Sequence, residues 1–420
     1  MVNREMKYSG IEWIGEIPKC WEITKFKYVM KKDKKIAKKY NDENIISLTK
    51  SGVIIRDLEN PFGKMPASFD GYQHVEEGDL LLCLFDIDVT PRCVGIVKNN
   101  GVTSPAYSRY KLMDGFDINY YNYLLTYLDD EKILLSYTKS LRNTLTDEYF
   151  GAVSTIKPSL VEQQKIAAFL NEKTSHIDNI IENTKKSIEN LKAYKQSLIT
   201  ETVTKGLDSN VEMKDSGIEW VKKVPKHWRV NKVRYFMKEK SVKNHPNEMI
   251  LSLYRDYGVV PKNSRDDNHN VTSLNTETYK LVEENELVIN KMKAWQGSLA
   301  ISKYEGIISP AYYIFAIDQK KLLPEFLHYM FRNPVYIDEY KRLSAGIRPG
   351  QWDLNKDEFK NVLYAYPESV QEQKKIAEFL DEKTYQIDSL INQKDKLIVE
   401  LESYKKSLIY EYVTGKKEVK

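Results

Sequence analysis

Two pairs of loops carry the side chains of this sequence that are best suited to chemistry with another molecule. One pair comprises residues 86–92 and 291–297, and the other comprises residues 140–144 and 346–350. Their Gly, Pro, Asn and Ser residues are typical of exposed loops. In the major groove of DNA, arginine and lysine match the edge of guanine, whereas asparagine and glutamine match that of adenine. We therefore predict DNA contacts by Arg92, Arg142, Asn143, Lys291, Lys293, Gln296, Arg348 and Gln351.

The alternative to DNA contact is the same for each of these residues: the loops are ordinary solvated loops, and their arginine forms a salt bridge. Charge gives only a modest indication, because the net charge is +4, with 64 Lys and Arg against 60 Asp and Glu. The lysine-rich segment 31–39 could contact phosphates, and solvated lysines are an equally good interpretation. Any nucleic-acid surface is therefore expected to be local, without a uniformly basic face.

The sequence shows no pattern of a catalytic or metal centre. It has no phosphate-binding P-loop, no GxGxxG after a strand and no paired His/Cys spacing, and its six histidines are scattered. Arg332-Asn-Pro-Val-Tyr336 is close to the Asn-Pro-Pro-aromatic motif of adenine methyltransferases, but Val335 replaces the second proline. We interpret it as a turn that ends a helix. We expect no catalytic residue, no metal and no cofactor on this chain.

The chain contains an internal repeat that frames these loops. Residues 6–31 match residues 213–238 at an offset of 207, with 14 identities in 26 positions. Residues 162–204 match residues 372–414 at an offset of 210, with 24 identities in 43 positions. The roughly 120 residues between head and tail diverge, apart from fragments such as Ser-Pro-Ala-Tyr at 104–107 and 309–312. The matched ends are therefore expected to have the same function in both copies, whereas the middles are expected to have two different versions of one function.

Each matched tail is predicted to be one long helix. Ser159 with Glu162, and Ser369 with Glu372, have the spacing of a capping box, in which the serine accepts from a first-turn amide and the glutamate reaches back. Gly206 and Gly415 stand where a C-terminal cap is expected. The first helix is therefore expected to extend from about residue 160 to residue 205.

Apolar residues recur every seven positions along both tails, which predicts a paired coiled coil. Two separate amphipathic helices lying on globular domains are the alternative, and the heptads alone do not give the direction of pairing. Thr184 and Lys394 occupy one matched position of this stripe, where they either fix the register or face a partner protein. The predicted seam residues are Leu170, Ile177, Ile181, Ile188, Leu191, Leu198, Leu380, Ile387, Ile391, Ile398, Leu401 and Leu408.

The middles are predicted to be compact α/β units with a β-rich core. Strand-like runs lie at 45–48, 80–85, 94–97 and 107–112, and at 250–253, 287–289, 299–301 and 312–317, with helical patterns near 120–127 and 324–331. We predict the domains 1–158, 159–207, 208–367 and 368–415, of which the first and third contain the middles and the others are the long helices.

Length and composition are those of a folded cytoplasmic protein. The 420 residues allow two or three domains, and 30% charged with 41% hydrophobic residues argues against a disordered class. Three cysteines without a CxxC pair favour a reducing compartment. The longest purely apolar run, residues 80–85, is far too short to cross a membrane.

The head motif SGIEWIGEIPKCWE, the SPAY segments, the EQQKIAAFL…YKQSLI tails and their two-copy layout resemble the specificity subunit of type I restriction-modification enzymes. The resemblance covers nearly the whole chain. It implies an α/β fold with two target-recognition domains separated by two conserved helices that pack antiparallel. Each recognition domain would recognise one half of a bipartite, asymmetric site on double-stranded DNA, and the helices would set the spacer.

The same resemblance implies the partners of the chain. Two methyltransferase subunits would dock on the matched regions, and endonuclease/translocase subunits would join them. S-adenosylmethionine, ATP and magnesium would belong to those partners. A non-reading assembly scaffold, or an inactive orphan subunit, is the alternative function. The missing catalytic motifs speak against a third possibility, a self-contained modification enzyme.

Overall fold

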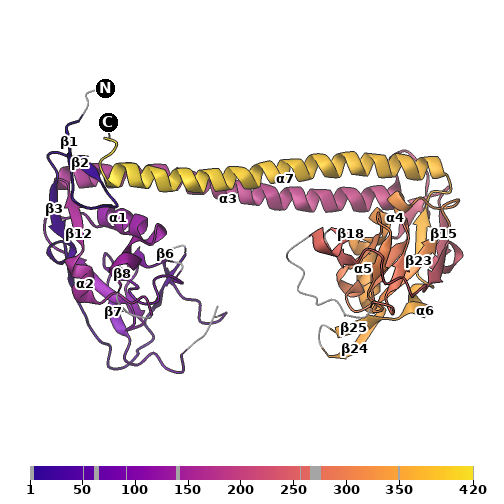
Figure 1. The fold of residues 1–420 in the computed structure, drawn as a ribbon, viewed down its shortest axis with the longest axis horizontal. Helices are drawn as coiled ribbons and strands as arrows, with labels where there is room; N and C mark the ends of the chain where they lie inside the picture. The colour runs from indigo at the N-terminus through magenta and orange to yellow at the C-terminus, as the bar shows by residue number, and fades with distance from the viewer. Residues whose placement is uncertain are drawn as a thin grey trace. The chain divides into compact units, whose positions relative to one another are not determined.

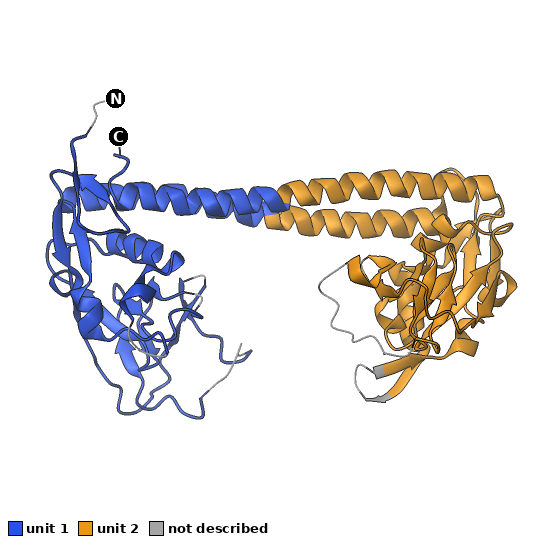
Figure 2. Cartoon of the chain, viewed as in Figure 1, with its two compact units in different colours: residues 1–184, 395–420 blue, residues 185–394 orange. Residues whose placement is uncertain are grey.

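The computed structural model describes residues 4–50, 52–60, 66–90, 92–138, 142–255, 257–264, 276–348 and 351–419. The chain forms two compact units, drawn in different colours in Figure 2. Unit 1 contains residues 1–184 and 395–420, and unit 2 contains residues 185–394. Each unit therefore combines one head, one middle and a segment of each long helix. No helix among the described residues is long and apolar enough to cross a membrane.

Unit 1 consists mainly of short strands with two helices (Figure 1). Its strands are β1 (Met6–Tyr8), β2 (Glu16–Pro18), β3 (Glu22–Lys25), β4 (Met30–Lys32), β5 (Ile45–Thr49), β6 (Gly52–Ile55), β7 (Gln73–Val75), β8 (Leu80–Leu82), β9 (Val94–Ile96), β10 (Gly101–Thr103), β11 (Ser108–Leu112) and β12 (Ser154–Lys157). Its helices are α1 (Ile118–Asp130) and α2 (Asp147–Ala152), with the 3-10 turns η1 (Phe26–Tyr28) and η2 (Ile133–Tyr137).

Unit 2 repeats this plan with more helix (Figure 1). Its strands are β13 (Met213–Asp215), β14 (Lys223–Pro225), β15 (Arg229–Lys232), β16 (Met237–Lys240), β17 (Leu251–Tyr254), β18 (Gly258–Pro261), β19 (Lys280–Val282), β20 (Leu287–Asn290), β21 (Leu299–Ile301), β22 (Gly306–Ile308), β23 (Tyr312–Ile317), β24 (Ser344–Arg348), β25 (Gln351–Leu354) and β26 (Leu363–Tyr366). Its helices are α4 (Pro324–Phe331), α5 (Pro334–Arg342) and α6 (Lys356–Phe359), with the 3-10 turns η3 (Val233–Tyr235), η4 (Lys262–Ser264) and η5 (Ala294–Gln296).

The same four-stranded antiparallel sheet lies in both middles. Its order is β4-β11-β8-β9 in unit 1 and β16-β23-β20-β21 in unit 2. Strands β8 and β20 hold equivalent places in these two sheets, and both are apolar. β8 (Leu80–Leu82) is buried throughout, and in β20 (Leu287–Asn290) only the last residue is partly exposed. The predicted α/β class with β-rich middles is therefore confirmed, and the predicted runs at 299–301, 312–317 and 324–331 coincide with β21, β23 and α4.

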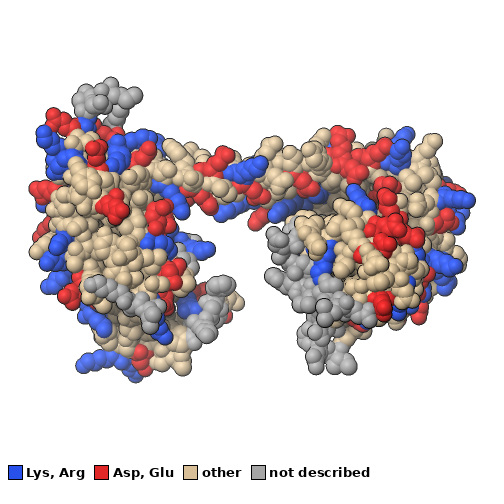
Figure 3. Space-filling view, viewed as in Figure 1, with Lys and Arg blue, Asp and Glu red and all other residues tan. Residues whose placement is uncertain are grey.

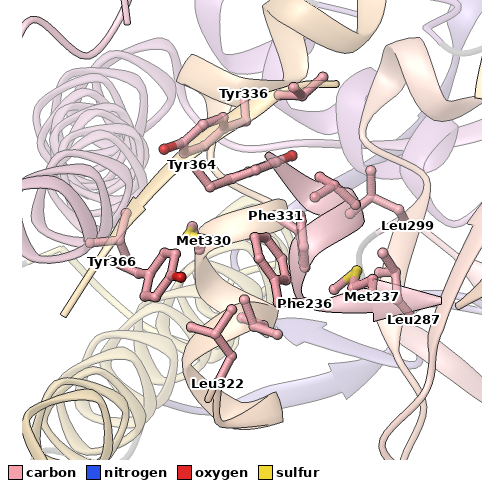
Figure 4. Close-up of a cluster of buried hydrophobic side chains, with 14 of the residues drawn as sticks. Phe236, Met237, Leu287, Leu299, Leu322, Met330, Phe331, Tyr336, Tyr364 and Tyr366 are labelled. Atoms are coloured by element: carbon pink, nitrogen blue, oxygen red, sulfur yellow. The ribbon is translucent and has the colours of Figure 1, made fainter. Parts of the chain in front are cut away.

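An aromatic core fixes α4 and α5 to the strands of unit 2 (Figure 4). Tyr336 stacks on Tyr364 with ring centroids 4.3 Å apart, and Phe331 meets Tyr364 edge-on at 4.9 Å. The hydroxyl groups of Tyr340 and Tyr364 form a hydrogen bond, so the polar ends of these buried rings are satisfied. The hairpin β24–β25 follows α5 directly in the chain.

The long helices are α3 (Leu160–Lys205) and α7 (Val370–Val413). In unit 1, Lys405 of α7 forms an ion pair with Asp178 of α3 at 2.6 Å, so the last part of α7 lies beside the first part of α3. In unit 2, Lys195 of α3 pairs with Asp388 of α7, also at 2.6 Å. Phe169 also packs against Tyr412 in unit 1, and Gly206, just after α3, lies beside Glu372 in unit 2. With two such contacts in each unit, the two helix segments are antiparallel within each unit.

Most of the predicted seam residues are buried. Buried are Leu170, Ile177, Ile181, Ile188, Leu380, Ile387, Ile391, Ile398 and Leu408, whereas Leu191, Leu198 and Leu401 are partly exposed. Thr184 is buried as well, and its hydroxyl donates to the Ile180 carbonyl of its own helix at 2.7 Å. The hydroxyl is therefore satisfied without a partner helix.

Candidate nucleic-acid interface

The two candidate loops of unit 1 lie side by side. The amide of Asp86 donates to the carbonyl of Arg142 at 3.2 Å, and that of Ile87 donates to the carbonyl of Asn143 at 3.3 Å. Asp86 and Asn143 both have a φ of +46°, which these residue types tolerate better than most. Arg142 is exposed and Asn143 is partly buried. Two segments more than 50 residues apart in sequence thus form one small surface.

Arg92 of the same loop is held inside unit 1. Its guanidinium contacts Asp130 at 2.9 Å and Asp129 at 3.4 Å, and its side chain is one-fifth exposed. Asp129 is itself buried and accepts from the amide of Cys93 at 2.8 Å and from Lys132 at 2.9 Å. Arg92 therefore has the salt-bridged environment of the alternative interpretation, and it is the weakest DNA-contact candidate in this unit.

The corresponding loops of unit 2 are also adjacent. The amide of Leu354, at the end of β25, donates to the carbonyl of Lys291 at 2.9 Å, and Lys291 pairs with Asp353 at 3.1 Å. Trp295 packs against Trp352 of β25 with ring centroids 5.0 Å apart. The loop 291–297 and the hairpin β24–β25 therefore form one surface.

The remaining predicted residues of unit 2 lie on this surface or at its edge. Lys293 directly precedes η5, Gln296 is its last residue, and both are exposed. Arg348 and Gln351 are paired across the hairpin, and their side chains lie outside the described residues. Base contact by any of the eight predicted residues stays a prediction.

The sequence analysis did not predict a lysine cluster that lies beside this surface. Lys280 and Lys356 place their ammonium groups 5.9 Å and 5.6 Å from the ring centre of Tyr313, one from β19 and one from α6. The hydroxyl of Tyr313 reaches the carbonyl of Leu354 at 3.5 Å. These residues come from separate elements, so no spacing in the sequence connects them. Figure 3 shows that Lys and Arg are otherwise interspersed with Asp and Glu on the face in view.

In both units, a glutamate of the tail forms a hydrogen bond with a tryptophan of the head. This contact corrects the capping-box prediction. The amides of Glu162 and Glu372 do donate to Ser159 and Ser369, at 3.3 and 3.4 Å. The glutamate side chains do not reach back as predicted. The Glu162 carboxylate accepts from the indole of Trp21 at 2.8 Å and pairs with Arg4, because a buried indole N–H 141 residues away competes for it.

Unit 2 has the same junction. Glu372 accepts from the indole of Trp228 at 2.9 Å and contacts His227 at 2.9 Å. The neighbouring Gln163 and Gln373 are fully buried and accept from the amides of Asp117 and Leu323, which immediately precede α1 and α4. The start of each long helix therefore fixes both the head and the first helix that follows the sheet.

The described residues show no assembled metal centre. No group of three or more His, Cys, Asp or Glu side chains among them is arranged to hold a metal ion. Burial raises the pKa of the Cys83 and Cys93 thiols, which disfavours the reactive thiolate. Asn333 of the Asn-Pro-Val-Tyr segment caps α5 by accepting from the Val335 amide at 3.1 Å, and its amide group donates to Thr200 at 3.0 Å. It lies in the turn between α4 and α5, as interpreted from the sequence.

Comparison with known proteins identifies the fold. No protein-family model and no curated protein matches the chain. A chain from the structure described as the complex assembly and conformational transition of the type I R-M system superimposes with a TM-score of 0.68, at 12% identity, over 96% of this chain and 99% of that one. The HsdS subunit from Thermoanaerobacter tengcongensis superimposes with a TM-score of 0.56, at 13% identity, over 96% and 98%. The chain therefore has the fold of type I restriction-modification specificity subunits, as the sequence motifs indicated.

Proposed function

We propose that this chain is the DNA-binding specificity subunit of a type I restriction-modification enzyme and carries no catalytic activity of its own. The main observation in support of this proposal is that the two units share one framework and differ at the surface formed by their paired loops. In both units the head, the sheet and the tail junction are equivalent. The loop after the central strand carries Asp86 and Arg92 in unit 1, but Lys291, Lys293 and Gln296 in unit 2. Two equivalent supports with unlike side chains are suited to two unlike half-sites.

Each unit is proposed to recognise one half of a bipartite, asymmetric site on double-stranded DNA. Loop backbones held by hydrogen bonds, such as that between Leu354 and Lys291, give the exposed side chains a fixed place from which to contact base edges. α3 and α7 contribute segments to both units, so we propose that their length sets the spacer between the half-sites.

The matched regions are proposed to dock two copies of one partner, the methyltransferase subunit. Tyr28 and Tyr235 hold equivalent places in the two heads and are 58% and 60% exposed. Tyr194 and Tyr404 hold equivalent places on α3 and α7, and each is 57% exposed. Exposed tyrosines contribute little to the packing of the chain itself, whereas tyrosine is enriched in protein interfaces. Their retention in both copies supports a duplicated docking surface.

The cofactors of the enzyme are proposed to reside on those partners. S-adenosylmethionine would be bound by the methyltransferase subunits, and ATP and magnesium by the endonuclease/translocase subunits.

Single-molecule methylome sequencing tests this function. The chain is expressed with the methyltransferase subunit encoded beside it, and the methylome is compared with that of the same host without the chain. A split adenine-methylation motif that appears only with the chain is expected. A stable complex, shown by pull-down, that adds no motif would instead support an assembly scaffold or an inactive orphan subunit.

A further inference from the structure

The lysine cluster of unit 2 is built around one tyrosine. The ammonium group of Lys280 donates to the carbonyl of Tyr312 at 2.6 Å and lies near the ring of Tyr313, which Lys356 also approaches. No carboxylate among the described residues forms an ion pair with Lys280. Lys356 shares Glu239 with Lys360, at 2.8 and 3.2 Å, and Lys291 pairs with Asp353.

The cluster has an excess of positive charge at a partly buried position. Burial lowers the pKa of Lys280, and repulsion from Lys243, Lys356 and Lys291 adds to this effect, whereas Glu239 opposes it. The protein therefore holds several ammonium groups together, and Glu239 and Asp353 balance only part of their charge. An anion bound between them would relieve that repulsion.

Unit 1 has a neutral side chain where unit 2 has Lys280. Gln73 begins β7 as Lys280 begins β19, and its amide group donates to the carbonyl of Tyr107 at 2.6 Å, as Lys280 does to Tyr312. The hydrogen bond that supports the fold is thus the same in both units. The positive charge at this position is an addition of unit 2, and the fold does not require it.

The neighbouring ion pair is reversed between the units. In unit 2, Lys356 begins α6 and pairs with Glu239 of β16. In unit 1, Asp147 begins α2 and pairs with Lys32 of β4. The amide of Leu354 donates to the carbonyl of Lys291, and in unit 1 the amide of Leu145 donates to that of Leu84, so these two positions are structurally equivalent. The three lysines 280, 291 and 356 therefore correspond to Gln73, Leu84 and Asp147 in unit 1. At this place unit 2 has three lysines against the carboxylates of Glu239 and Asp353, whereas unit 1 has the single ion pair of Lys32 with Asp147.

We propose that Lys280, Lys291 and Lys356 form a phosphate-binding site that holds the DNA backbone beside the half-site recognised by unit 2. This inference rests on the proposed function. Lysine binds a phosphate as a compact point charge, and backbone contacts of this kind position a protein on DNA without specifying sequence. Lys291 continues directly into the candidate base-contacting loop, so a phosphate held here would orient that loop. Unit 1 lacks the site, so the two half-sites are bound with unequal dependence on salt.

Replacing Lys280 with Gln tests the site without removing its structural hydrogen bond, because Gln73 makes that bond in unit 1. The complex of the full chain with its methyltransferase subunits is titrated with a duplex that carries the methylated motif, at several salt concentrations. Losing one phosphate contact reduces the slope of log K against log[salt] by about 0.9. When the salt concentration rises fourfold, the affinity of the variant therefore falls by a factor that is about 3.5 times smaller than for the wild type.

Two further variants complete the experiment. Lys280→Gln combined with Lys356→Gln is expected to reduce the slope about twice as much as Lys280→Gln alone. Lys321→Gln removes a cation that pairs with Asp318 beyond the opposite end of β23, and its slope is expected to equal that of the wild type. In all variants the methylated motif is expected to stay unchanged, because phosphate contacts carry no sequence information.

The outcomes separate this site from the proposed function. An unchanged slope for Lys280→Gln, in a complex that assembles and binds DNA normally, would overturn the site and leave the function intact. A changed methylation motif would also overturn it, since the lysine would then contact a base. A wild-type complex that neither binds the duplex nor methylates DNA would refute the proposed function, and the site with it.

Discussion

Replacing either of the two glycines that follow the long helices with alanine should lower the free energy of unfolding, by unequal amounts. Gly206 and Gly415 have φ angles of +77° and +73°, so both positions penalise a residue with a Cβ atom. A Cβ on Gly206 would find its nearest atom, in Trp228, at an ordinary contact distance of 3.5 Å. A Cβ on Gly415 would lie 2.5 Å from Pro18 and 2.9 Å from Trp21, two buried rings that cannot move aside cheaply.

The magnitudes follow from these distances. Gly206→Ala should cost only the left-handed backbone penalty, about 1–2 kcal/mol of unfolding free energy. Gly415→Ala should add an overpacking cost of about 1–3 kcal/mol, because the head must shift away from the helix end. Asparagine tolerates this backbone conformation better than alanine, so Gly206→Asn should recover much of the loss, whereas Gly415→Asn should not.

Denaturant unfolding of the purified chain, followed by circular dichroism and tryptophan fluorescence, measures these differences. The affected transition is that of unit 2 for Gly206 and that of unit 1 for Gly415. Equal costs for the two alanine variants would refute the reasoning, because the contacts of Pro18 and Trp21 would then have no energetic effect. A loss below about 0.5 kcal/mol for both would refute the backbone argument as well.

Three further outcomes are expected. Burial, with Arg332 and Lys303 nearby, lowers the pKa of His328 from 6.5 to about 3; the unfolded chain therefore binds more protons, and unit 2 should lose stability as the pH falls from 6.5 toward 3. Thermal unfolding at pH 7 and pH 5 should show this loss, and His328→Asn should reduce it; an equal loss in the variant would contradict the assignment. Inserting one heptad into both α3 and α7 adds about 10 Å of helix and should lengthen the methylated motif's spacer by about 3 base pairs, with both half-sites unchanged in a methylome. Arg142→Ala and Arg348→Ala should each weaken binding by about 1–3 kcal/mol and relax opposite halves of the motif, and unchanged specific affinity would remove that arginine from the base-contacting set.

The long helices were predictable because their signals are local. α3 begins at Leu160 and ends at Lys205, as the serine cap, the heptads and Gly206 indicated. A helix closes its hydrogen bonds within itself, so its ends depend on residues a few positions apart. The strands β21 and β23 were predictable for a similar reason, because a short apolar run bounded by turn residues is a local pattern.

Local patterns failed where a distant side chain competed. The spacing of Ser159 and Glu162 predicts a reciprocal cap, but Trp21 and Arg4 take the carboxylate. The composition of the loop around Arg92 predicts an exposed side chain. Instead, Arg92 forms ion pairs with Asp129 and Asp130 at the end of α1. In both cases a buried or charged group supplied by the fold outweighs the interaction that the sequence neighbourhood offers.

The sequence alone determined the repeat, the helices, the β-rich middles and the loops that differ between them, because these depend on periodicity and on comparison of the chain with itself. The heptads left the direction of helix pairing open, since a heptad stripe is equally apolar for parallel and antiparallel partners, and the tertiary structure confirms the antiparallel packing that the family resemblance implied. Only the tertiary structure joined loop 291–297 to the hairpin β24–β25, and brought Lys280 and Lys356 to one tyrosine. Such sites depend on distances between elements far apart in sequence, and those distances are set by packing.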